Sequence, residues 1–385
     1  MIARNRQHPH ATRRPGGLLA LAAIVCAATG ATAGDLSGSF SLGTGYYDHP
    51  LGIEGETPAG FLTQALRIST RLGASPTTSR PLPDVVKLGY EGNASQFDNE
   101  TELGNMRHAL GLEYFHTSPV AEGDPRAHSL SLGAQGALRR YEGGYTIYDY
   151  HELYAYAAFR RHAGTNTLWS GFGALRLRRY GELPEESFVE PHGQLKVQRF
   201  FSGRTTLGLS ARFGVKTYND SAASAVWGTP NLPSTSQAAA RLEFSQGVSD
   251  RVGLRVRVDS RHTLSDFPYY VSEDIFDSPL LDTYAHQGWD ALAVLKWLAP
   301  LQVWTELGYS RGEHDYGSLL FAGTPAGQTR DDSVAEIFTT LRRRLAGHRD
   351  GPELQLTAGW RDQRSTIDTY TYDGLFAHTS LAWNF

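Results

Sequence analysis

The chain has 385 residues, of which 40% are hydrophobic and 20% are charged, and its formal net charge is −4. The negative mean hydropathy excludes a bundle of membrane helices. The 41 glycines and 18 prolines are too scattered for collagen or for a low-complexity tract.

Residues 1–33 contain, in sequence, the three regions of a secretory signal peptide. Four arginines and no acid precede an apolar run at 18–28, and Ala31-Thr32-Ala33 places small residues at a cleavage position. The run has 11 residues, whereas a helix needs about 18 or more to span a bilayer. We expect cleavage after Ala33, which leaves residues 34–385 as one domain with a net charge of −8. That charge argues against nucleic acid as a partner.

The only cysteine, Cys26, lies inside the apolar run. A lipoprotein would carry its lipid there, but the bulky Val25 replaces the small residue expected before a lipidated cysteine. The exported domain then has no disulfide and depends on its own packing and hydrogen bonds.

From residue 34 onward, apolar and polar residues alternate with a period of two, which indicates strands. In 251–262, for example, valines and a leucine share one face while arginines and an aspartate share the other. We expect sixteen strands, at 35–48, 61–73, 84–98, 102–117, 127–142, 147–162, 166–180, 188–201, 204–218, 235–248, 251–264, 285–299, 301–316, 331–346, 353–366 and 373–385.

The links between these strands are of two kinds. Those after even-numbered strands are mostly brief, such as Ser202-Gly203 and Ser249-Asp250. Those after odd-numbered strands include the longest, 219–234 and 265–284. Short periplasmic turns and long extracellular loops are typical of outer-membrane barrels. The sequence therefore predicts an all-β fold, a transmembrane antiparallel β-barrel of about 16 strands, with 14 or 18 as the alternatives.

A strand that spans a membrane must satisfy its backbone hydrogen bonds within the sheet, which requires closure. Aromatic residues gather towards the expected strand ends, among them Tyr46, Tyr141, Trp297, Tyr309 and Tyr316. This arrangement fits the two interfacial girdles of such barrels. A soluble β-sandwich with an aromatic core is the alternative, since it shows the same alternation.

The last expected strand carries one apolar stripe. It consists of Leu375, Ala377, Thr379, Leu381, Trp383 and Phe385. This segment resembles the C-terminal recognition strand of bacterial outer-membrane barrels, in which a terminal Phe is typical. The resemblance implies the outer membrane of a Gram-negative bacterium, lipid and lipopolysaccharide around the barrel, and the barrel-assembly machinery as a partner.

If the apolar residues face lipid, their neighbours face a lumen with 19 basic and 8 acidic side chains. A low-dielectric wall focuses the field of unpaired bases on the axis, and about 16 strands leave an aqueous channel. We therefore expect a pore that prefers small anions, with a plugged or structural barrel as the alternative. The expected selectivity residues are Arg176, Arg178, Arg212, Arg241, Arg255, Arg257, Arg261, Arg342 and Arg344.

Loop 265–284 is the candidate constriction, since its acids could face the lumen arginines. It contains Tyr269, Tyr270, Glu273, Asp274 and Asp277. The arrangement resembles the eyelet of general porins, although their constriction loop follows the fifth strand and this one follows the eleventh. An external lid is the equal alternative.

Catalytic and metal motifs do not emerge from the spacing. The chain has no HExxH, no GxSxG and no phosphate-binding glycine loop, and its histidines are scattered. We expect no enzyme, no cofactor and no metal site.

Three functions remain open. The first is passive diffusion of small hydrophilic solutes, and the second is export of an acidic exopolysaccharide, which would resemble alginate-type exporters. The third is a plugged structural or assembly barrel. The solute, the direction of transport and the oligomeric state stay undetermined.

Overall fold

A computed structural model describes residues 36–48, 58–72, 84–98, 104–119, 126–184, 187–219, 234–265, 286–316, 329–345 and 351–384. The strands are β1 (Leu36–Tyr47), β2 (Ala59–Leu72), β3 (Val85–Phe97), β4 (Asn105–Pro119), β5 (Ala127–Tyr141), β6 (Tyr150–Ala163), β7 (Thr167–Tyr180), β8 (Phe188–Phe201), β9 (Thr205–Tyr218), β10 (Thr235–Gly247), β11 (Val252–Thr263), β12 (Gln287–Ala299), β13 (Val303–Asp315), β14 (Asp331–Arg344), β15 (Glu353–Ser365) and β16 (Tyr372–Asn384). Short 3-10 segments are η2 (Gly143–Tyr148), η4 (Pro300–Gln302) and η5 (Asp368–Tyr370). No helix in these described ranges has the length and apolar character needed to cross a bilayer.

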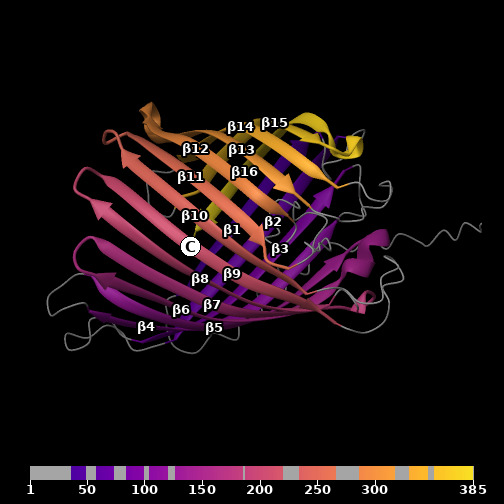
Figure 1. The fold of residues 1–385 in the computed structure, drawn as a ribbon, viewed down its shortest axis with the longest axis horizontal. Coiled ribbons are helices and arrows are strands. Elements are labelled where there is room, and N and C mark those ends of the chain that lie inside the picture. The colour runs from indigo at the N-terminus through magenta and orange to yellow at the C-terminus, as the bar shows by residue number, and fades with distance from the viewer. Residues whose placement is uncertain are drawn as a thin grey trace, which may run out of the picture.

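The sixteen strands close into one antiparallel barrel (Figure 1). Each strand pairs with its neighbours in the chain, and β1 pairs with β16 from Ser39 opposite Asn384 to Tyr47 opposite Phe376. Closure gives every strand a partner on both sides, so the barrel presents no bare sheet edge to hydrocarbon. The expected barrel and its expected strand number are confirmed.

The outer face of the barrel is apolar. Leu209 on β9 and Leu375 on β16 are 58% and 61% exposed, and leucines recur at alternate positions around the sheet. The side chains between them point into the barrel, are mostly polar or charged, and form ion pairs between strands, such as that of Lys196 with Glu243. An apolar belt on a closed barrel with a polar interior is the arrangement in which strands cross a membrane.

Strand bounds lie within a few residues of the expected ones, and two differences have clear causes. The strand expected from 147 begins at Tyr150, because η2 precedes it and Asp149 fixes the turn. The Asp149 carboxylate accepts hydrogen bonds from the Tyr141 N–H (2.6 Å) and from Arg140 Nη1 (2.9 Å). The strand expected from 301 begins at Val303, because Leu301 has a positive φ of 63° in the turn η4.

The aromatic girdles are only partly as expected. Trp297 and Trp304 beside the turn η4, together with Tyr46 and Tyr309, are exposed on the outside of the barrel. The interpretation of Tyr141 and Tyr316 as girdle residues is wrong, because they are only 5% and 1% exposed. Both lie at the loop end of the barrel, where neighbouring side chains cover them.

Candidate functional site

The inner face of the barrel carries all nine arginines expected in the lumen. They alternate with exposed apolar residues such as Leu175, Leu242, Val258 and Ile337. Strand β7 carries Arg176 and Arg178, β9 carries Arg212, β10 carries Arg241, β11 carries Arg255, Arg257 and Arg261, and β14 carries Arg342 and Arg344. The structure distributes these groups over several separate networks.

The first network pairs the arginines of β7 with two glutamates. Glu152 accepts Arg178 Nη2 at 2.6 Å and lies 3.7 Å from Arg176 Nε. Arg176 Nη1 also donates to Glu190 at 3.1 Å. Arg178 and both glutamates are almost completely buried, and the Arg178 guanidinium lies 4.1 Å from the ring centroid of Tyr150. Glu152 also lies 3.9 Å from Arg107 Nη2, so three arginines share two glutamates in this network. Burial of Arg178 and of both glutamates, more than full neutralisation, keeps their charge away from a passing ion.

The second network lies on β10, β11 and β12. The Asp259 carboxylate is shared by Arg241 Nε at 2.5 Å and Arg257 Nε at 2.8 Å. Arg261 Nη2 lies 3.3 Å from Asp290 Oδ2. Two guanidinium groups therefore depend on one carboxylate, which leaves a net positive charge on this wall.

A recess of about 550 Å³ opens beside this second network, which we call the basic recess. Its wall contains more bases than acids. The charged members are Arg212, Arg241, Arg257, Arg261, Arg361, Asp259, Asp290 and Glu336. An anion in this recess would meet positive charge from four strands, because the bases come from β9, β10, β11 and β15.

A second recess, of about 640 Å³, lies against β1 to β6 and is closer to neutral. Arg67 pairs there with Glu91 at 3.1 Å. Lys87 lies 3.9 Å from Glu113, which also accepts the Tyr156 hydroxyl at 2.8 Å. Of the two recesses, the basic recess therefore carries the larger positive charge.

Nearer the turns, lysines pair with glutamates. Lys196 Nζ lies 2.5 Å from Glu243, and Lys296 Nζ lies 2.8 Å from Glu306. Arg344 is more than half exposed and lies 3.6 Å from Glu353. The inner face therefore becomes more balanced in charge towards this mouth.

Three inner acids were missed by the sequence reasoning, namely Glu190, Asp332 and Glu353. Glu190 lies an even number of residues from the inward-facing Lys196 on the same strand, and Glu353 lies an even number from Arg361. The alternation of side chains could therefore have placed both glutamates on the inner face. Asp332 is the second residue of β14, where its carboxylate accepts a hydrogen bond from Arg330 Nη2 at 2.6 Å and both side chains are buried. The basic excess of the lumen is therefore smaller than the sequence count, although bases still outnumber acids.

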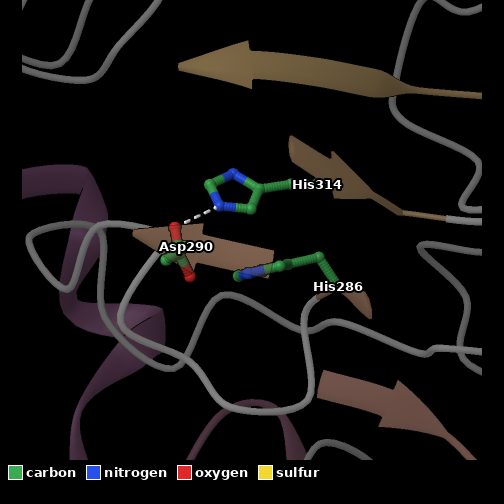
Figure 2. A group of neighbouring side chains, drawn as sticks. All are labelled: His286, Asp290 and His314. Atoms are coloured by element: carbon green, nitrogen blue, oxygen red, sulfur yellow. Dashed lines mark hydrogen bonds and ion pairs between the residues drawn. The ribbon is translucent and has the colours of Figure 1, made fainter. Parts of the chain in front are cut away.

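Two histidines and an aspartate meet at the loop end of β12 and β13, and we call His286, Asp290 and His314 the rim triad (Figure 2). One ligand-type atom from each residue lies within 4.8 Å of the others. Figure 2 shows both imidazoles pointing toward Asp290, and His314 Nε2 is 2.8 Å from Asp290 Oδ1. His286 is fully buried and His314 nearly so. The separated positions in the sequence gave no signal of this cluster.

The environment of His286 favours the neutral imidazole. Burial, reinforced by the nearby guanidinium groups of Arg261 and Arg330, holds the pKa of His286 well below its ordinary value. Its Nε2 contacts Arg261 Nη1, and its backbone carbonyl accepts Gln237 Nε2 at 2.9 Å. The ring is thus fixed between a guanidinium and the wall of the barrel.

Several expected features lie outside the described residues. They are the signal peptide at 1–33, the terminal Phe385, and the candidate constriction residues Tyr269, Tyr270, Glu273, Asp274 and Asp277. Of the expected assembly strand, Leu381 and Trp383 lie on β16 in the outward stripe, and Trp383 stacks on Phe40 across the closing seam with centroids 5.8 Å apart.

Comparison with known proteins supports the fold. No protein-family model and no curated protein matches the chain. Among solved structures, OccAB1 of Acinetobacter baumannii is similar with a TM-score of 0.53 at 10% identity, covering 91% of this chain and 96% of that one. OpdK of Pseudomonas aeruginosa, solved with vanillate, has a TM-score of 0.50 at 11% identity over 91% and 98%.

CdiB from Acinetobacter baumannii is similar with a TM-score of 0.52 at 12% identity, over 91% of this chain and 60% of that one. These likenesses concern the fold. Together with the closed sheet and its apolar outer belt, they identify the fold as that of the outer-membrane β-barrels, with sixteen strands and an outer face suited to lipid.

Proposed function

We propose that the protein is a passive outer-membrane channel for small hydrophilic solutes, and that it prefers anions. The observation that carries this proposal is the basic recess, where Arg212, Arg241, Arg257, Arg261 and Arg361 face three acids on the inner wall of a sixteen-strand barrel. Diffusion through such a channel involves no chemical step and no cofactor.

The charge of the recess favours anions for two physical reasons. A barrel of about 16 strands is wide enough to hold water along its axis. The low-dielectric wall around that water focuses the field of every base that lacks a full countercharge. Because Asp259 is shared between Arg241 and Arg257, the two pairs cannot both be neutral.

The route to the membrane forms part of the same proposal. Residues 1–33 would direct export and then be removed, leaving residues 34–385 as the barrel. The outward stripe of β16, with Leu381 and Trp383, would be the surface that the barrel-assembly machinery recognises before the strand closes against β1. Lipopolysaccharide would surround the part of the finished barrel that lies in the outer leaflet.

The test is the ion selectivity of the purified protein in a planar bilayer. In a potassium chloride gradient, the reversal potential should show that chloride is more permeant than potassium. Vanillate, the aromatic carboxylate of the OpdK structure, should reduce the chloride current if the basic recess holds carboxylates. A channel that prefers potassium would contradict the proposal, and a barrel with no conductance would favour the plugged alternative.

A further inference from the structure

We propose that the rim triad of His286, Asp290 and His314 is a binding site for one divalent metal ion of the zinc class, at the extracellular mouth of the barrel. The site goes beyond the proposed channel function and does not depend on it. The site links His286, which precedes β12, and Asp290 on β12 to His314 on the neighbouring strand β13.

The spacing of the three side chains is close to that of a zinc site. The candidate ligand atoms all lie within 4.8 Å of one another. Tetrahedral zinc with bonds of about 2.0–2.2 Å holds its ligand atoms about 3.3 Å apart. The widest separation in the triad therefore exceeds the zinc spacing by about 1.5 Å at most, and the 2.8 Å contact between His314 Nε2 and Asp290 Oδ1 would open by about 0.5 Å.

Both imidazoles keep a buried nitrogen that the described protein does not engage. Nε2 of His314 faces Asp290, and Nε2 of His286 faces Arg261, but neither Nδ1 atom has a hydrogen-bond partner in the described part of the chain. Buried polar atoms are nearly always satisfied in native proteins. The two rings therefore have unused hydrogen-bonding capacity next to the carboxylate of Asp290.

Arg261 shows that this position already attracts a cation. Its guanidinium contacts His286 Nε2 and lies 3.3 Å from Asp290 Oδ2. A metal ion would take over the same imidazole and carboxylate, so Arg261 and the metal compete for them. Displacement of Arg261 would return its charge to the basic recess, which it also lines.

Two glycines shape the site. A Cβ atom at Gly312 would lie 2.4 Å from Asp290 Oδ1 and 2.9 Å from His314 Nε2, so the missing side chain makes room for this pair. Gly288 has a φ of 137°, and a Cβ there would lie 1.9 Å from the Glu313 carbonyl oxygen. Tyr316 then covers both rings, with centroids 5.4 Å from His286 and 6.5 Å from His314.

The ligand types select the metal. Two imidazole nitrogens and one carboxylate oxygen suit zinc and its first-row neighbours, whereas calcium and magnesium require mostly oxygen. Three protein ligands leave a fourth position for water. Bound here, the ion would link His286, just before β12, to His314 on β13 at the mouth.

The experiment is zinc titration of the purified full-length barrel, without an affinity tag, by calorimetry. Cobalt(II) replaces zinc in a parallel titration, in which the visible spectrum reports coordination geometry. We expect one site per barrel and a tetrahedral cobalt spectrum. His286→Gln and His314→Gln should each weaken binding at least about 10–100-fold, since even the loss of an outer partner costs that much in metal sites.

The matched control is His151→Gln, which removes an exposed histidine from the outside of β6 and should leave binding unchanged. Arg261→Gln should tighten binding, because the competing cation is gone; a merely structural role for the triad predicts no such gain. Gel migration before and after heating verifies that each barrel is closed, and Asp290→Asn replaces any variant that fails to close. Absence of zinc binding, or equal affinity in the triad variants and the control, would overturn the proposal.

Discussion

Reversal of two lumen charges gives the sharpest test of the anion channel. The variant is Arg255→Glu with Arg257→Glu, on the inner face of β11. Arg257 lines the basic recess and shares Asp259 with Arg241. The double change replaces two positive charges with two negative ones, so the charge of the inner wall falls by four units.

The magnitude follows from screened Coulomb energies. For an ion passing about 8 Å away in about 0.1 M salt, each unit charge contributes about 0.2 kcal/mol. Four units shift the free energy of a monovalent ion by about 0.9 kcal/mol, which is about fivefold in its concentration. Because anions and cations shift in opposite directions, the anion-to-cation permeability ratio should fall about 20-fold. The low-dielectric wall makes this a lower bound.

The assay is the reversal potential in a planar bilayer under a potassium chloride gradient. Arg255→Gln with Arg257→Gln changes only two units of charge and should lower the ratio about fivefold. The matched control, Arg161→Glu with Arg179→Glu, makes the same charge change at exposed positions on the outside of β6 and β7. If the control shifts selectivity as much as the lumen variant does, or if the lumen variant shifts nothing, the reasoning is refuted.

Three further predictions concern stability, each measured as the temperature or pH at which the closed barrel loses its fast gel migration. Gly288→Ala should destabilise the barrel by about 1–3 kcal/mol or more, because its φ of 137° and the nearby Glu313 carbonyl exclude a Cβ; an unchanged melting temperature would contradict this. Asp332→Asn should cost about 3–5 kcal/mol, since it removes the carboxylate that forms an ion pair with the buried Arg330, whereas Asp373→Asn should cost little. Burial raises the pKa of the Tyr370 phenol in the folded barrel. The stability that the neutral phenol contributes is therefore present below about pH 10, and it is lost as the pH rises through the pKa of Tyr370 in the folded state. Tyr370→Phe should weaken this loss of stability at alkaline pH, and equal alkaline midpoints for the two proteins would refute the role given to Tyr370.

Several features of the fold could be predicted because they are local. A side-chain period of two needs only neighbouring residues, and it located the strands to within about three residues. The number of strands, sixteen, followed from the positions at which that period is interrupted. The placing of arginines such as Arg257 on the inner face followed from their alternation with apolar residues. Exceptions arose where a turn has its own chemistry, as at Asp149, whose carboxylate fixes the end of η2.

The pairing of charges could not be predicted, because it depends on register between strands. Asp259 accepts both Arg241 and Arg257 only because β10 and β11 pair Arg241 directly opposite Asp259. A different register would have joined the same bases to other acids and left a different wall exposed. The difference between the buried Arg178 of β7 and the more exposed Arg257 of β11 is therefore a tertiary property.

By itself, the amino-acid sequence determined a closed, membrane-spanning barrel with an apolar outside and a basic inside, since alternation and loop length are written along the chain. Only the tertiary structure decided where charge is neutralised and where it remains. It also brought His286, Asp290 and His314 together, because the register of β12 and β13 places Asp290 opposite Gly312 and leaves room there for the imidazole of His314. Such contacts depend on how two strands are aligned, and no spacing within either strand records that alignment.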